Sequence, residues 1–182
     1  MIDIYKPRLT LLQQEIMMFF SMKAGMSFNA HRLAKELCVS QTAISKAIPL
    51  LEKEDMITIN KDDDSGRLSI ELNRDNPRVI ALKRIDNLKM FYESGLAGFL
   101  FDSFPGSTIV LFGSYSMGED TVNSDADIAI IGMKQKNIDL KEFEKKMERE
   151  INLNFYKSLK DVDRNLRNNI LNGIVISGSI DL

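Results

Sequence analysis

The sequence predicts an α+β protein of two small domains: a helical domain with a β-hairpin, then a small mixed sheet backed by helices. Three observations lead to this fold class. The first part of the chain carries three helix-spaced apolar stripes and then alternating strands. Asn73–Pro77 breaks that pattern and places a domain boundary between residues 1–75 and residues 76–182. The second part contains two apolar strands, Thr108–Phe112 and Asp125–Ile131, joined by a polar connection.

The first domain is expected to consist of three helices and a hairpin. Pro7 stands at a favoured helix start, and Ser27 or Asn29 can cap the second helix. Leu68, Ile70 and Leu72 alternate with polar residues, as the second hairpin strand requires. The expected helices span residues 8–24, 30–37 and 41–54, and the expected strands span residues 56–60 and 67–72.

This order of elements resembles a winged helix-turn-helix of the kind found in prokaryotic transcription regulators. The resemblance implies that the third helix enters the DNA major groove with its early residues forward. Its outward-facing candidates for contact with bases or phosphates are Gln41, Thr42, Ser45 and Lys46.

The alternative is that these four side chains are an ordinary solvated helix face and that the domain docks a partner or dimerises. Two features favour this alternative. The tip of the expected wing carries Asp62-Asp63-Asp64, where a DNA-binding wing usually places Lys or Arg. Residues 1–75 contain ten Lys and Arg against eleven Asp and Glu, so this domain has no basic surplus.

The second domain is expected to begin with a long linking helix over about residues 78–104. Its apolar set includes Ile80, Ile85, Leu88 and Phe91, and Gly95 and Gly98 could bend it. The elements expected after the two strands are a helix at 140–149, a strand at 151–155, a helix at 161–171 and a short strand at 174–177.

The most informative motif joins a Gly113-Ser114 turn to the pair Asp125 and Asp127. Alternate side chains of a strand point to opposite faces, so the two carboxylates point one way while Ala126 and Ile128 point into the core. Carboxylates at this spacing repel each other unless a cation lies between them. Magnesium binds carboxylate oxygen, keeps some of its waters and accepts phosphate oxygens as further ligands. Taken alone, each half is more often a plain turn or a solvated strand end; the conjunction predicts a nucleotidyl-transfer site.

These residues resemble the minimal nucleotidyltransferases of the DNA polymerase beta superfamily, over about residues 78–178. The resemblance implies in-line attack on the α-phosphorus of a nucleoside triphosphate, ATP being the expected one, with pyrophosphate leaving. It assigns catalysis and magnesium binding to Asp125 and Asp127, and nucleotide binding to Gly113 and Ser114.

Two positions depart from the pattern of that family. Its third carboxylate matches Asn152, which carries no charge, and Glu150, one strand period earlier, is the candidate catalytic substitute. The Arg that many relatives carry after Gly-Ser is absent. Lys134 or Lys136 could supply a phosphate clamp instead, but no motif secures either lysine, and the alternative is that both are solvated.

Three functional hypotheses follow from these motifs. The first is a magnesium-dependent nucleotidyltransferase that modifies a hydroxyl on a partner protein, because stand-alone relatives resemble antitoxins that nucleotidylate a helical toxin. The second is a DNA-binding transcription regulator whose degenerate transferase domain senses nucleotide or dimerises. The third is a scaffold in which neither domain is active. A homodimer is compatible with each hypothesis.

Composition limits the compartment and the site chemistry. The net charge of -2 gives no overall basic field, so contacts with nucleic acid have to be local. The single cysteine excludes an internal disulfide and fits a reducing compartment. The only histidine, His31, excludes a His-rich zinc site. No membrane-length apolar run or signal-peptide pattern is present, so a cytoplasmic protein is expected.

Overall fold

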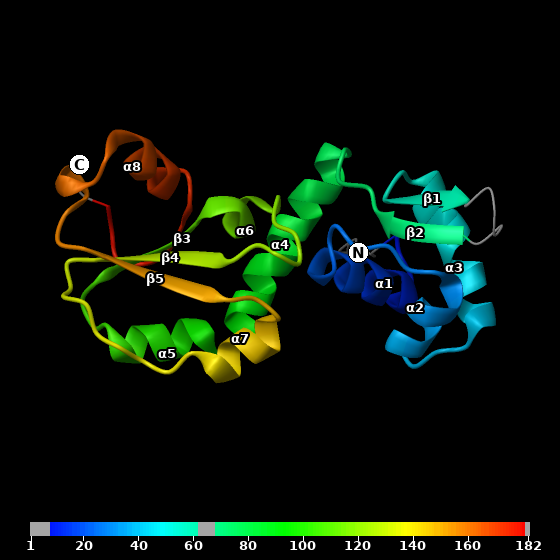
Figure 1. Ribbon diagram of the computed structural model, residues 1–182, viewed down its shortest axis with the longest axis horizontal. Coiled ribbons are helices and arrows are strands. Elements are labelled where there is room, and N and C mark those ends of the chain that lie inside the picture. Colours follow the sequence, from blue (N-terminus) through cyan, green and yellow to red (C-terminus); the bar gives the residue numbers. More distant parts are fainter. Residues whose placement is uncertain (1–7, 62–67, 181–182) are drawn as a thin grey trace, which may run out of the picture. The chain divides into compact units, whose positions relative to one another are not determined.

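The computed structural model describes residues 8–61 and 68–180. The chain divides into two compact units, residues 1–79 and residues 80–182. The division falls within the first turn of helix α4 (Pro77–Glu93), which is shown in green in Figure 1. The acidic wing tip at residues 62–64 lies outside the described residues.

The N-terminal unit contains three helices and a hairpin, in the order expected from the sequence. Each helix begins at a side chain that accepts a backbone N–H bond, as helix N-caps do. Thr10 accepts from Gln13 in a full capping box, Asn29 accepts from Arg32, and Ser40 accepts from Ala43. The elements are α1 (Leu11–Met22), α2 (Ala30–Glu36), α3 (Gln41–Lys53), β1 (Ile57–Lys61) and β2 (Leu68–Leu72).

Packing in this unit joins the helices to the hairpin. Phe28, between α1 and α2, forms an isolated bridge with Ile70 of β2, and both residues are buried. The core is completed by Ile16, Phe20, Leu33, Ile44 and Leu51. Three helices, an antiparallel hairpin and a short strand bridge to that hairpin constitute a winged helix-turn-helix, so the predicted fold of this part is confirmed.

The expected long helix is wrong in its extent, because two helices occupy its place. Helix α4 ends at Glu93, and α5 spans Leu96–Ser103. Gly95 between them has φ +87°, a conformation that only glycine adopts without strain. The Ser94 hydroxyl caps the break, donating to the Phe91 carbonyl and accepting from the Leu96 N–H.

A four-stranded mixed sheet forms the centre of the C-terminal unit, in the order β5-β4-β3-β6. Strands β4 and β5 run parallel, and β3 runs antiparallel to both β4 and β6. The strands are β3 (Thr108–Phe112), β4 (Ala126–Ile131), β5 (Ile151–Tyr156) and β6 (Ile174–Ser177). The helices are α6 (Gly113–Met117), α7 (Lys141–Met147) and α8 (Arg164–Leu171), with a 3-10 turn at Leu159–Asp161. The α+β fold class is confirmed.

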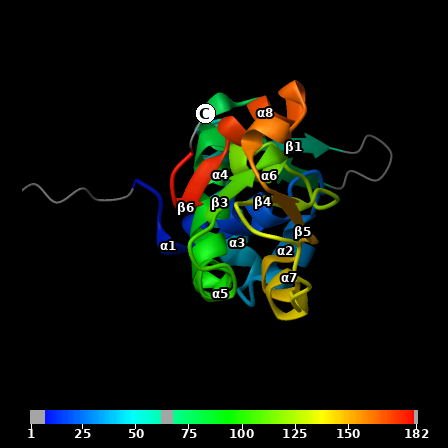
Figure 2. The ribbon, with the colours of Figure 1, turned by 90° about the vertical axis from the view of Figure 1, so that its left-hand side faces the viewer.

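Both faces of this sheet are covered. Helices α5 and α7 cover one face and α8 covers the other, as Figures 1 and 2 show. Ala126, Ile128 and Ile130 belong to the core on the α5 side, whereas Val110 and Ala129 belong to the core on the α8 side. No helix within the described residues combines the length and the apolar character needed to cross a membrane.

Candidate nucleotide and metal site

The two halves of the Gly-Ser and Asp-x-Asp motif meet at one end of the sheet. Phe112, the last residue of β3, pairs directly with Asp127 of β4, so Gly113 follows beside that carboxylate. Gly113 has φ +74°, and a Cβ atom at this position would lie 2.8 Å from Asp127 Oδ2. A side chain would therefore both strain the turn and displace the carboxylate. Ser114, in the first turn of α6, is half-buried, and the Ser116 hydroxyl donates to the Gly113 carbonyl at 2.8 Å.

Asn152 of β5 completes the polar end of the strand pair. It lies opposite Asp127 in the parallel register, and its Nδ2 donates to Asp125 Oδ2 at 2.9 Å. Burial raises the pKa of the Asp127 carboxyl, the Asn152 hydrogen bond lowers it, and the Asp125 carboxylate raises it again. Ionisation of Asp127 therefore costs free energy in the folded protein, and a bound cation would reduce that cost.

The chemistry of these groups fits a magnesium ion. The side chains of Asp125 and Asp127 offer carboxylate oxygens next to a glycine turn that leaves room for a polyphosphate. No cluster of three or more His, Cys, Asp or Glu side chains within the described ranges is arranged to hold a metal. The candidate Glu150 precedes β5, and its carbonyl accepts from Ala126 N–H at 2.8 Å, but its carboxylate does not complete a three-carboxylate cluster.

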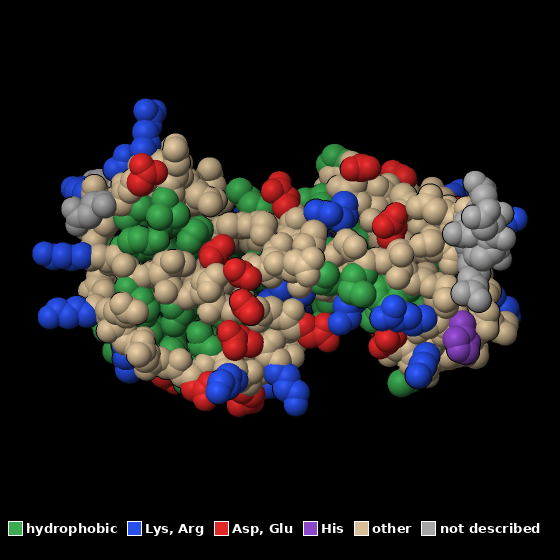
Figure 3. All heavy atoms as spheres, in the orientation of Figure 1, with side chains coloured by type: hydrophobic (Ala, Val, Ile, Leu, Met, Phe, Trp, Pro, Cys, Tyr) green, Lys and Arg blue, Asp and Glu red, His purple; other side chains and the backbone are tan. Residues whose placement is uncertain are grey.

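A cavity of about 500 Å³ opens beside Asp125. Figure 3 shows Asp and Glu side chains gathered over the part of this unit where β4 and β5 begin. Arg149 is the one basic residue among those that line the cavity. The lining residues are Val122, Asn123, Ser124, Asp125, Glu144, Glu148, Arg149 and Glu150.

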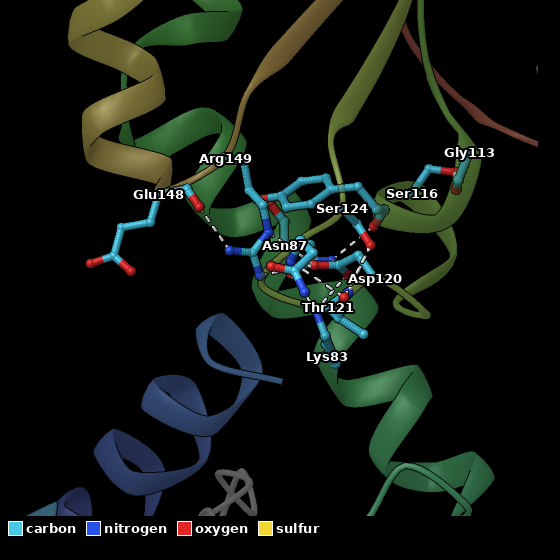
Figure 4. A network of polar contacts seen from close by, with 11 residues as sticks. Lys83, Asn87, Gly113, Ser116, Asp120, Thr121, Ser124, Glu148 and Arg149 are labelled. Carbon is cyan, nitrogen blue, oxygen red and sulfur yellow. Dashed lines mark hydrogen bonds and ion pairs between the residues drawn. The ribbon is translucent and has the colours of Figure 1, made fainter. Parts of the chain in front are cut away.

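Behind this cavity lies a buried polar network that the sequence analysis missed. Asp120, in the connection before β4, is fully buried and accepts hydrogen bonds from three side chains (Figure 4). Lys83 Nζ lies 2.5 Å and Asn87 Nδ2 lies 2.7 Å from Asp120 Oδ1, and Arg149 Nη2 lies 3.2 Å from Oδ2. Figure 4 shows the Glu148 side chain pointing away from this cluster. The network joins α4, the connection before β4 and the turn between α7 and β5.

The same connection is held against α4 by a close backbone approach. A Cβ atom at Gly118 would lie 2.5 Å from the Ile80 carbonyl, so only glycine fits there. Tyr115 packs beside this contact, and its hydroxyl donates to the Asn87 carbonyl at 3.2 Å. Burial, and then the Asp120 carboxylate, raise the pKa of the Tyr115 hydroxyl, so the tyrosine stays neutral. These contacts hold the connection between α6 and β4 in place, and Asp125 is the last residue of that connection.

The two lysines considered as phosphate clamps lie elsewhere. Lys134 and Lys136 follow the far end of β4, whose strand rise separates Ile131 from Asp127 by roughly 13 Å. Lys136 Nζ instead lies 3.5 Å from the Ser103 carbonyl. Both lysines therefore follow the end of β4 that lies away from the Gly113 turn and the Asp pair, which agrees with the solvated alternative.

The candidate DNA-contacting side chains lie together on the N-terminal unit. Gln41, Thr42, Ser45 and Lys46 are all exposed, in the first two turns of α3 directly after the Ser40 cap. Ile44, Ala47 and Ile48 occupy the buried face of the same helix. The geometry leaves these four residues available to a partner, and their role stays a prediction.

The comparisons with known proteins agree with the geometry of the C-terminal unit. Residues 106–179 match the model of a family described as polymerase beta, nucleotidyltransferase. This unit carries a nucleotidyltransferase-superfamily domain. The matched segment begins just before β3 and ends after β6, so the nucleotidyltransferase model spans the whole sheet.

Solved structures give a further comparison. The chain is similar to the adhesin competence repressor AdcR from Streptococcus pyogenes, with 26% identity over 53% of this chain and 69% of that chain and a TM-score of 0.41. It is also similar to a cysteine-to-serine mutant of ZitR from Lactococcus lactis, with 17% identity over 57% and 68% of the two chains and a TM-score of 0.40. No curated protein matches the chain.

Proposed function

We propose that the C-terminal unit is a magnesium-dependent nucleotidyltransferase that moves a nucleoside monophosphate from a nucleoside triphosphate, ATP first, to a hydroxyl on a partner protein. The observation that carries the proposal is the contact between the Gly113 turn and Asp127. The Gly113 turn leaves room for phosphate, and the carboxylate pair needs a cation. The two lie so close that a Cβ at Gly113 would touch the Asp127 carboxylate. The nucleotidyltransferase family match at residues 106–179 supports the same reaction class.

The residues of the chain would act mainly by positioning and by charge. The Gly113 backbone lets a triphosphate approach, and the Ser114 hydroxyl and backbone amide donate to its terminal phosphate oxygens. Asp125 and Asp127 would hold magnesium, which neutralises the charge that develops on the α-phosphate and the leaving pyrophosphate. Asn152 orients Asp125 through its 2.9 Å hydrogen bond. The cavity beside Asp125 is where an acceptor hydroxyl would approach.

Transfer of labelled nucleotide tests this function. The purified protein is incubated with magnesium, a cell extract and ATP labelled either at the α-phosphate or at the γ-phosphate. Nucleotidyl transfer leaves the α label on an acceptor and removes the γ label with pyrophosphate, whereas a kinase does the reverse. We expect α-labelled product with the wild type and none with Asp125→Asn/Asp127→Asn. Absence of α label with all four nucleoside triphosphates would contradict the proposal.

A second candidate function is DNA binding by the N-terminal unit, with the transferase domain sensing nucleotide. The exposed set at the start of α3 favours it, because early residues of this helix are those that reach base edges in a helix-turn-helix. Retardation of genomic DNA fragments, measured with and without magnesium and nucleotide, tests it. Salt-sensitive retardation that nucleotide changes would support a regulator; no retardation at low salt would exclude one. The cytoplasmic location, the homodimer and the toxin-like acceptor remain predictions.

A further inference from the structure

Asn152 stands at the position where a third metal-binding carboxylate would act on the Asp pair. The parallel register places it beside Asp127, and its Nδ2 lies 2.9 Å from Asp125 Oδ2. One neutral amide is therefore bonded to Asp125 and lies beside Asp127 in the strand register.

The charge supplied by these residues is small for two metal ions. Two divalent cations in one site lie about 3.5–4 Å apart and together carry four positive charges. Asp125 and Asp127 supply two negative charges, and Asn152 supplies none. A cation next to a neutral amide loses the attraction that makes a carboxylate a strong magnesium ligand.

Other acidic side chains do not make up the difference. Glu150 precedes β5 and lines the same cavity as Asp125, but no three-carboxylate cluster forms among the residues that the structure describes. Glu144 is also a lining residue, but Oε1 of its carboxylate accepts from the Ile151 N–H at 3.2 Å. Glu148 also lines this cavity, and it likewise joins no three-carboxylate cluster within the described ranges.

We propose that this site binds a single divalent cation, through Asp125 and Asp127, and that Asn152 sets this number. The inference rests on the proposed nucleotide site and makes it more specific. A carboxylate at position 152 would raise the capacity of the site to two cations.

Counting bound manganese tests the proposal without measuring activity. The full chain is titrated with Mn²⁺ in the absence of nucleotide, because a triphosphate binds Mn²⁺ by itself and would add an ion to the count. The free ion is measured by electron paramagnetic resonance. We expect one bound Mn²⁺ per chain for the wild type and two for Asn152→Asp. Asn154→Asp, which adds a carboxylate one strand period further along the same face of β5, is the matched control and should bind one.

The possible outcomes separate this proposal from the proposed function. Two ions in the wild type would overturn the inference and leave the nucleotide site intact; a return to one ion in Glu150→Gln would then assign the second ion to Glu150. One ion in both the wild type and Asn152→Asp would also overturn it. No bound ion in the wild type would overturn the proposed function as well. Asn152→Ala, which places no new charge in the site, should keep one ion and serves if Asn152→Asp fails to fold.

Discussion

The contact between Gly113 and Asp127 leads to a prediction that separates folding from binding. In Gly113→Ala the new Cβ has to adopt φ +74° and lies 2.8 Å from Asp127 Oδ2. The left-handed conformation alone costs an L-residue about 1–2 kcal/mol. The Asp127 carboxylate is the end of a side chain and can rotate away, so the clash adds little to the folding cost. Rotation instead removes the carboxylate from its place beside Asp125.

Gly106→Ala is the matched control for this variant. Gly106 has φ +80°, and no atom lies within 4 Å of the position that its Cβ would take. Both variants should therefore lose the same stability, about 1–2 kcal/mol, or roughly 4–8 °C in Tm for each kcal/mol in a domain of about 100 residues. Urea unfolding followed by circular dichroism measures this loss.

Nucleotide binding should distinguish the two variants. A ligand at a hundred times its Kd stabilises the folded state by about 2.7 kcal/mol. Gly106→Ala should keep the whole of this magnesium-nucleotide stabilisation. Gly113→Ala should lose at least half of it, because a tenfold weaker Kd removes about 1.4 kcal/mol. Equal stabilisation of both variants would refute the assignment of Gly113 and Asp127 to one site.

Three further predictions concern the carboxylate pair, the buried network and the helix-turn-helix. Because the folded protein holds a proton on Asp127 more tightly than the unfolded chain does, the charge of Asp127 costs stability at neutral pH and this cost disappears as pH falls below its raised pKa. In urea unfolding without metal, Asp127→Asn should exceed the wild type in stability at pH 7, with a smaller difference at pH 4; the reverse trend would contradict the burial argument. Lys83→Met leaves the buried Asp120 charge short of a partner and should lower the free energy of unfolding by about 3–5 kcal/mol, whereas a loss below 1 kcal/mol would show that the pair is dispensable. If the N-terminal unit binds DNA, Lys46→Ala should reduce the magnitude of the slope of log affinity against log salt by about 1, whereas Lys53→Ala in the last turn of α3 should not.

Patterns with a short period made the strands and the motif predictable from the sequence. Thr108–Phe112 is a strand as expected, since its apolar run ends at a glycine turn. Alternation correctly placed Ala126 and Ile128 in the core. The family resemblance matched Asn152 to the carboxylate site before its register beside Asp127 was known. These predictions depend on the spacing of apolar and polar residues within short segments, which can be seen in one sequence.

Contacts between distant segments were not predictable in the same way. Ile85 was expected to be in the apolar set of the linking helix, yet its side chain is 62% exposed. The buried positions of α4 are instead Val79, Lys83, Asn87 and Phe91, which follow one another at spacings of four residues. This buried stripe was not recognised in the sequence because Lys83 and Asn87 are polar residues. Their regular spacing between two apolar residues is the signal that could have revealed it, but their partner Asp120 belongs to a connection with no periodicity.

The most direct test of the nucleotide site is thermal unfolding of the full chain with each nucleoside triphosphate, with and without magnesium, beside Asp125→Asn/Asp127→Asn. A ligand that binds only the folded state raises its stability by mass action. We expect at least one nucleotide, ATP first, to raise the Tm of the wild type only when magnesium is present, and to leave the double variant unchanged. An equal shift in both proteins, or no shift with any nucleotide, would contradict a magnesium-nucleotide site built on the Gly113 turn and the Asp pair.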